Sequence, residues 1–116
     1  AVAAETAVAV GLEAQVTINK SGQPFRLAED APIVVAVRRS YHEIAGKPLP
    51  VSGMRYSGDV SQFANVGGIP AIYHGTDQAT AHGDVECVPG AALVRCARVL
   101  LGATLYYLGL DEGTRA

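Results

Sequence analysis

Residues 56–108 read YSGDVSQFANVGGIPAIYHGTDQATAHGDVECVPGAALVRCARVLLGATLYYL, and this stretch contains the strand, loop and long helix on which the predicted fold rests. Within it, Ile69–Tyr73 is a continuous apolar run bounded by turn residues, which is typical of a buried strand in a covered sheet. A loop rich in glycine and polar residues runs from His74 to Glu86. Pro89 then opens a long helix with a broad apolar face. That face comprises Leu93, Val94, Ala97, Leu100, Leu101, Leu105 and Leu108.

Two more helices are predicted before this final one. Asp30 can cap the first, which has Pro32 in its first turn and a stop at Gly46. Ser57 or Asp59 can cap the second, which the Gly67-Gly68 pair ends.

Strands are predicted between these helices. Apolar and polar residues alternate toward the end of Val8–Ile18, and Pro48–Met54 is a shorter strand candidate. Alternating strands and helices predict an α/β fold with at least partly parallel strands. Ligands usually bind at the carboxyl edge of such a sheet, which directs attention to the loops at Ser57–Asp59 and His74–Glu86.

Composition excludes several classes of protein. The chain has 116 residues, 49% of them hydrophobic, and a formal net charge of -2, which suits one small folded domain rather than a disordered chain. Its scattered basic residues give no patch for nucleic acid. No run reaches the roughly 18 apolar residues of a membrane span. Cys87 and Cys96 are interpreted as free, buried thiols of a cytoplasmic protein.

The densest polar group lies in the second loop, with His74, Asp77, His82, Asp84 and Glu86 within thirteen positions. A neutral imidazole at a sheet edge is a suitable zinc ligand, and nearby carboxylates can orient it. On spacing alone, however, a loop histidine is more often solvated or hydrogen-bonded than bound to metal.

The order of these pieces resembles the closing segment of a family of zinc-dependent amidohydrolases and exopeptidases. The family includes acetylornithine deacetylase, succinyl-diaminopimelate desuccinylase, aminoacylase and the glutamate carboxypeptidases. The resemblance lies in Ser57-Gly58-Asp59, Phe63, Gly68-Ile69-Pro70, Gly75, Ala81-His82 with Glu86, and the helix from Val88 to Leu108. Two departures are His74-Gly75-Thr76, where the family often has Gly-Pro-Gly, and Gly83-Asp84-Val85 between the histidine and the glutamate.

The resemblance implies a division of the chain. Residues 1–20 match the last strand of a truncated lid, or dimerisation, domain, and residues 21–116 match the C-terminal part of the catalytic domain. The implied fold is the C-terminal half of a mixed-sheet zinc-exopeptidase domain, with helices packed on the sheet.

The resemblance also implies site residues. His82 matches the last metal ligand of a two-zinc centre whose other ligands are absent from this chain, and cobalt is a second candidate metal. Arg26, Gly58 and Asp59 are expected to bind substrate, because a guanidinium suits a substrate carboxylate and the other two shape the pocket. Glu86 and Asp84 are expected to hydrogen-bond around the metal ligand, although solvated carboxylates are equally compatible with the sequence.

The implied function is removal of an acyl group from an N-acyl amino acid, or cleavage of a small peptide, by a longer protein. The isolated chain is then expected to be inactive. The alternative is a non-catalytic interaction or dimerisation fragment. The expected partners are the substrate and either a second copy, through the lid, or a missing N-terminal half; neither nucleic acid nor a membrane is expected.

Overall fold

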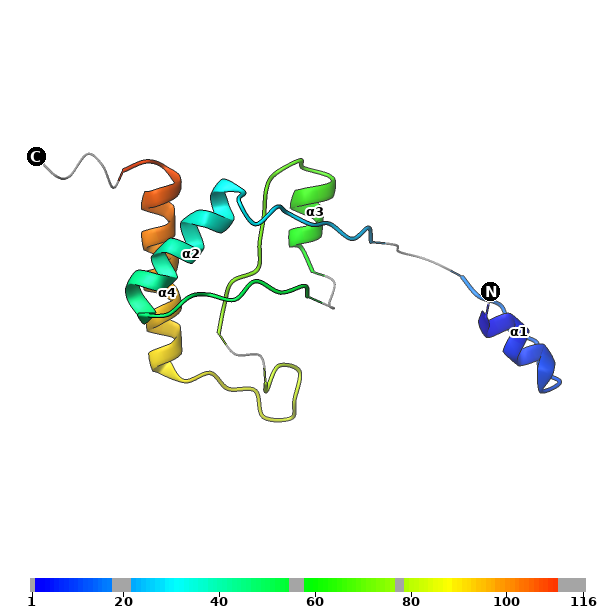
Figure 1. Ribbon diagram of the computed structural model, residues 1–116. Coiled ribbons are helices and arrows are strands. Elements are labelled where there is room, and N and C mark those ends of the chain that lie inside the picture. The colour runs from blue at the N-terminus through cyan, green and yellow to red at the C-terminus, as the bar shows by residue number, and fades with distance from the viewer. Residues whose placement is uncertain (1, 18–21, 55–57, 77–78, 111–116) are drawn as a thin grey trace, which may run out of the picture.

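The structure is helical. The computed structural model describes residues 2–17, 22–54, 58–76 and 79–110. Over these ranges it contains four helices and no β-strand: α1 Val2–Ala9, α2 Pro32–Ala45, α3 Val60–Asn65 and α4 Gly90–Tyr107. In Figure 1, α2 crosses α4, while α1 lies at the far end of the chain from them. Among the described helices, only α2 and α4 make substantial contact with each other.

Helix α2 confirms the predicted helix that has Pro32 in its first turn. Pro32 occupies the first helical position, where its fixed φ suits a helix and its missing N–H is not needed. Gly46 ends the helix with a φ of 67°, and its N–H donates to the His42 carbonyl oxygen at 2.9 Å. The predicted cap was wrong, because the N-cap is Ala31 and no side chain caps the helix.

Helices α3 and α4 are also confirmed. Asp59 is the N-cap residue of α3, but its side chain makes no capping hydrogen bond. Pro89 is the N-cap residue of α4, which extends for 18 residues. Gly109, with a φ of 67°, follows the end of α4 and permits the chain to turn away.

The core lies where α2 crosses α4. It consists of Ala36 and Val37 from α2, with Val99 and Ala103 from α4. Complete burial of a valine side chain such as Val99, which is 0% exposed, stabilises the fold by roughly 1.5–3 kcal/mol. Partly buried side chains surround this cluster, namely Tyr41, Leu49, Ile72 and Tyr106.

Small residues let the two helices approach closely. Ser40 is 1% exposed, and its hydroxyl donates to the Val99 carbonyl oxygen across the crossing at 2.8 Å. A Cβ on Gly102 would collide with the Ser40 hydroxyl oxygen and would lie 3.3 Å from its Cβ. The close approach of α2 to α4 therefore requires glycine at position 102.

The predicted α/β fold, and with it the implied mixed sheet, is wrong for the part of the chain that the structure describes. The strand predicted at Val8–Ile18 is replaced by the end of α1 and an exposed segment up to residue 17; Ile18 itself lies outside the described residues. The Ala-rich sequence of α1 favours a helix. Pro48–Met54 and Ile69–Tyr73 have no regular secondary structure. A strand requires the backbone of a second strand, and no described segment supplies one.

Candidate functional site

His82 lies on a small loop closed by its own hydrogen bonds, which we call the Thr80–Cys87 loop. The Thr80 hydroxyl donates to the Cys87 carbonyl oxygen at 2.8 Å and accepts from the Cys87 N–H at 3.2 Å. Inside the loop, the Gly83 N–H donates to the Thr80 carbonyl oxygen at 3.1 Å. The loop precedes α4 and lies near the bottom of Figure 1. These bonds hold a tight turn that presents His82 to solvent.

The backbone of His82 is unusual. Its φ is 63°, and it is the only non-glycine residue among those described with a positive φ. Histidine is one of the residues that enter this region more readily, yet the conformation still costs about 1 kcal/mol or more. Such backbone strain is concentrated at functional sites. The conformation of His82 is therefore compatible with a selected role for its imidazole.

Asp84 and Glu86 lie on the same loop and are exposed. Across the described ranges, no group of three or more His, Cys, Asp or Glu side chains is placed to hold a metal ion. Asp77, the remaining carboxylate considered in this region, lies outside those ranges. A catalytic zinc site takes about three protein ligands. The described donor set thus fits a single ligand of such a site and does not fit a complete metal centre.

The structure brings Tyr73, the residue before the second candidate loop, against Gly58 of the first. The Tyr73 hydroxyl lies against Gly58, where a Cβ would collide with it and would also lie 3.2 Å from Tyr73 Cζ. Glycine is thus required for this close approach. Asp59, the next residue, is exposed at the start of α3. Ser57, the other residue predicted as a cap, is not among the described residues.

His74 anchors the chain just before the Thr80–Cys87 loop. Its ring meets the Tyr41 ring of α2 edge-on, with 6.1 Å between the ring centroids and 81° between the ring planes. Partial burial lowers the pKa of His74 below its ordinary value of 6.5. This contact was missed from sequence. The available clue was that Ile72 and His74, two positions apart in an extended segment, share a side.

Arg26 is exposed in the segment that leads to α2. The Asn65 side chain donates to the Gln23 carbonyl oxygen at 2.7 Å, which holds the beginning of this segment beside α3. Figure 1 shows the segment passing α3. The bond from Asn65 holds Gln23 at the end of α3, and no contact among the described residues joins Arg26 to Gly58, Asp59 or His82.

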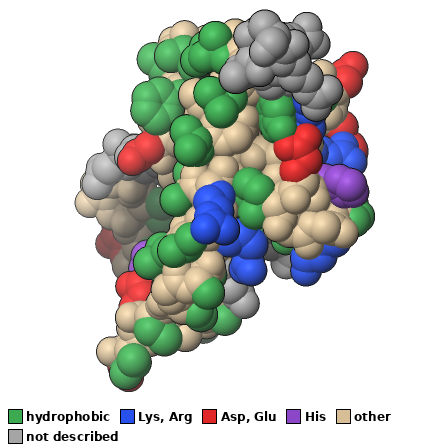
Figure 2. Space-filling view, turned by 90° about the vertical axis from the view of Figure 1, so that its left-hand side faces the viewer, with side chains coloured by type: hydrophobic (Ala, Val, Ile, Leu, Met, Phe, Trp, Pro, Cys, Tyr) green, Lys and Arg blue, Asp and Glu red, His purple; other side chains and the backbone are tan. Residues whose placement is uncertain are grey.

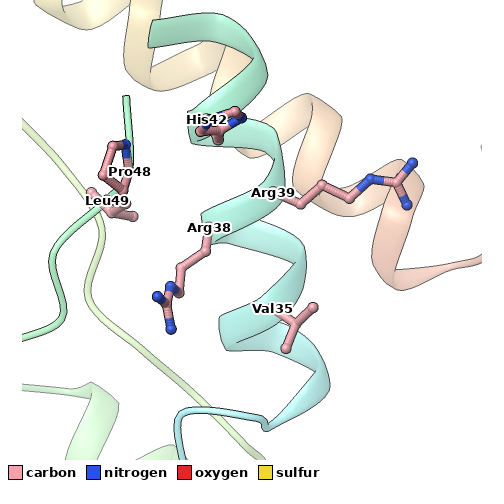
Figure 3. Close-up of a pocket in the computed structure, with 6 residues that line it drawn as sticks. All are labelled: Val35, Arg38, Arg39, His42, Pro48 and Leu49. Carbon is pink, nitrogen blue, oxygen red and sulfur yellow. The ribbon is translucent and has the colours of Figure 1, made fainter. Parts of the chain in front are cut away.

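A hollow on α2 does not form a second polar site. It is lined by Val35, Arg38, Arg39, His42, Pro48 and Leu49. Figure 3 shows Arg38 and Arg39 extending to opposite sides of α2. Arg38 pairs with Glu29 at 3.4 Å, and the Arg39 guanidinium lies 3.9 Å from the centre of the Tyr106 ring. The two cations do not converge on one ligand position.

Comparison with known proteins gives one match. Residues 2–105 match the family model described as peptidase family M20/M25/M40. No curated protein and no solved structure matches the chain. The matched residues include α1 to α3, the Thr80–Cys87 loop and nearly all of α4.

Proposed function

The chain belongs to peptidase family M20/M25/M40, and from this membership we propose that it forms part of a dinuclear zinc hydrolase. Members of the family are hydrolases that are generally metal-dependent. The proposed substrate is an N-acyl amino acid, which loses its acyl group, or a small peptide. The family match carries the proposal, because it spans most of the chain and includes the Thr80–Cys87 loop.

Each candidate residue has a specific role in the proposal. His82 supplies one imidazole ligand, and the remaining ligands come from residues outside this chain. Asp84 or Glu86 hydrogen-bonds near that imidazole and favours the ring orientation that binds metal. Zinc held by His82 and those other ligands would supply a Lewis acid for the scissile carbonyl group and would lower the pKa of a water bound to it to about 7.

Substrate recognition is assigned to the other predicted residues. The Arg26 guanidinium pairs with the substrate carboxylate, for which its planar donors are suited. Gly58 and Asp59 shape the floor of the pocket, and the close approach of Tyr73 to Gly58 supports a compact wall there. Because His82 is the one metal ligand that this chain supplies in the proposal, the isolated chain binds metal weakly and is inactive.

The division of the chain at residue 20 and the cytoplasmic location also remain proposals. Residues 1–20 would belong to the lid and residues 21–116 to the catalytic domain. Cys87 and Cys96 are free, which is usual in a reducing compartment, although Cys87 is exposed and Cys96 is half-buried instead of both being buried. No described helix is long and apolar enough to cross a membrane.

Zinc titration followed by NMR tests the metal assignment. Each of the chain's three histidines has its own ring resonances, which respond to zinc bound at that ring, and those of His82 should shift first. His82→Gly should remove this response. His42→Gln is the matched control, since His42 is an exposed histidine on α2 and its loss should leave the response of His82 unchanged. Zinc shifts confined to His42 or His74 would reject the assignment, and cobalt can serve as a second probe.

A non-catalytic interaction module is the second candidate. It is favoured by the apolar surface, because α4 leaves the large side chains of Leu93, Val94, Leu101, Leu105 and Leu108 between 41% and 64% exposed. Figure 2 shows hydrophobic side chains over much of one face. Such surfaces drive association, here with a second copy or with an N-terminal half of the enzyme. Self-association unaffected by zinc, with no zinc response at His82, would favour this function over the hydrolase.

A further inference from the structure

The segment between the two candidate loops makes contacts on both of its sides. Ile72 packs against the core of α2 and α4, and His74 meets Tyr41 on α2. Tyr73, between them, lies against Gly58. In an extended chain successive side chains point to opposite sides, so this alternation follows from the backbone.

We propose that Tyr73 and His74 are positioning residues, which together fix the Thr80–Cys87 loop relative to α2 and to the Gly58 segment. The proposal rests on the proposed function, since the residue to be positioned is His82. We refer to the contacts Tyr73–Gly58 and His74–Tyr41 as the clip.

The His74 half of the clip joins the segment before the loop to the packed core of α2 and α4. Tyr41 is half-buried and packs against the core cluster. An edge-to-face pair of aromatic rings contributes about 0.5–1.5 kcal/mol beyond the area it buries. Five residues lie between His74 and the beginning of the Thr80–Cys87 loop, which is closed by its own hydrogen bonds. The clip therefore restricts where that closed loop can lie.

The Tyr73 half joins the same segment to the start of α3. The atom that a Gly58 Cβ would meet is the hydroxyl oxygen at the tip of Tyr73, and the Tyr73 side chain is exposed enough to swing aside. Gly58→Ala should consequently displace the Tyr73 ring without unfolding the chain. Tyr73→Phe removes the colliding oxygen, and the nearest remaining ring atom, Cζ, would be 3.2 Å from the new Cβ. The double variant should therefore return the ring to its place.

The experiment measures the spread of distances between the loop and α2 in the full chain. The exposed Cys87 carries one spin label, a cysteine introduced at the exposed Val35 of α2 carries the other, and Cys96→Ala removes the remaining thiol. Double electron–electron resonance should give a narrow distance distribution in this parent. His74→Ala and Gly58→Ala should each broaden it at least twofold.

Two rescue variants separate positioning from a general loss of structure. His74→Phe keeps an aromatic ring against Tyr41, and Gly58→Ala with Tyr73→Phe removes the collision; both should restore the narrow distribution. In a full-length enzyme that carries this segment, His74→Ala should lower kcat/KM several-fold and His74→Phe should restore it, since the other metal ligands are then present.

The outcomes distinguish this inference from the proposed function. Unchanged distributions in His74→Ala and Gly58→Ala would overturn the clip. Broad distributions in the chain with an unaltered kcat/KM of His74→Ala in the full-length enzyme would overturn the positioning role. If zinc fails to shift His82 even in the parent, the proposed function falls, and the distance distributions still decide whether the clip exists.

Discussion

His82 combines a candidate metal ligand with a left-handed backbone at φ 63°, so its stability and its chemistry can be separated. His82→Gly removes the imidazole and also relieves the cost of that conformation. The free energy of unfolding should stay within about 1 kcal/mol of the parent value, while the zinc response disappears. His82→Ala keeps a Cβ and should be less stable than His82→Gly by up to about 1 kcal/mol. Urea unfolding followed by circular dichroism measures both, and a loss above about 2 kcal/mol in the glycine variant would indicate a structural imidazole.

Arg26 is predicted to bind the carboxylate of the substrate. In a full-length enzyme that carries this segment, Arg26→Ala should raise KM for carboxylate-bearing substrates by about tenfold to a hundredfold, since a hydrogen bond to a charged group contributes about 1.5–3 kcal/mol. Steady-state kinetics measures the change. Arg38→Ala is the control, because Arg38 pairs with Glu29 on the surface and its loss should leave KM unchanged. An unaltered KM in Arg26→Ala would remove the assignment.

His74 should make stability depend on pH. Burial lowers the pKa of His74 in the folded chain below 6.5, so the unfolded chain binds the proton first as the pH falls. The stabilisation by the neutral ring is complete above pH about 6.5 and is lost as the pH falls from there through the pKa of the folded chain. His74→Phe cannot be protonated and keeps a ring against Tyr41. Its free energy of unfolding should fall less steeply than that of the parent as the pH falls below about 6.5; equal slopes would contradict the prediction.

At the level of single residues, the sequence indicated which segment is a polar loop, but it did not indicate which distant residues touch one another. The type and spacing of His82, Asp84 and Glu86 indicated a polar loop, and the structure places all three on one. Their roles remain predictions. The contacts of Tyr73 with Gly58 and of His74 with Tyr41 join residues 15 and 33 positions apart, which no local pattern encodes.

Among the elements, the helix crossing offers a sharp test at Gly102. Gly102→Ala would force a methyl group against Ser40, so the free energy of unfolding should fall by about 1–3 kcal/mol. Gly90→Ala is the control, since nothing lies within 4 Å of the added carbon and alanine favours a helix. Adding Ser40→Ala to Gly102→Ala should cost less than the sum of the two single changes, because the colliding oxygen is gone. Chemical denaturation measures the free energy of unfolding of the four variants. If the loss in the double variant equals the sum of the two single losses, the strain does not come from the contact between Gly102 and Ser40.

The sequence predicted the helices α2 to α4 correctly and the strands wrongly, and this difference has a physical reason. A helix forms its hydrogen bonds within four residues, so Pro32, Gly46 and Pro89 sufficed to place the two long helices. A strand needs a partner strand, which can lie at any distance along the sequence, and the apolar run Ile69–Tyr73 carries no information on whether such a strand is present. In the structure its Ile72 packs against helices instead.

In the molecule as a whole, α4 carries apolar side chains on two of its sides. One face packs on α2 through Val99 and Ala103. The opposite face exposes a stripe of large side chains at helical spacing, with Leu101 near its middle and 64% exposed. An exposed stripe of large apolar side chains is typical of a surface that binds another protein. The molecule is therefore expected to associate through this stripe.

Leu101→Lys tests that expectation at its centre. The substitution places a charge where an associating surface would exclude water, so the dissociation constant of the self-associated chain should rise at least about tenfold. Helix content should not change, because Leu101 contributes little to the core and lysine favours a helix. Gln62→Lys adds the same charge on exposed α3 and should leave association unaltered, which separates a local effect from net charge. Sedimentation velocity over a concentration series measures both variants. Equal sedimentation of the parent and Leu101→Lys at every concentration would mean that this stripe does not hold copies of the chain together, and that any association uses another surface.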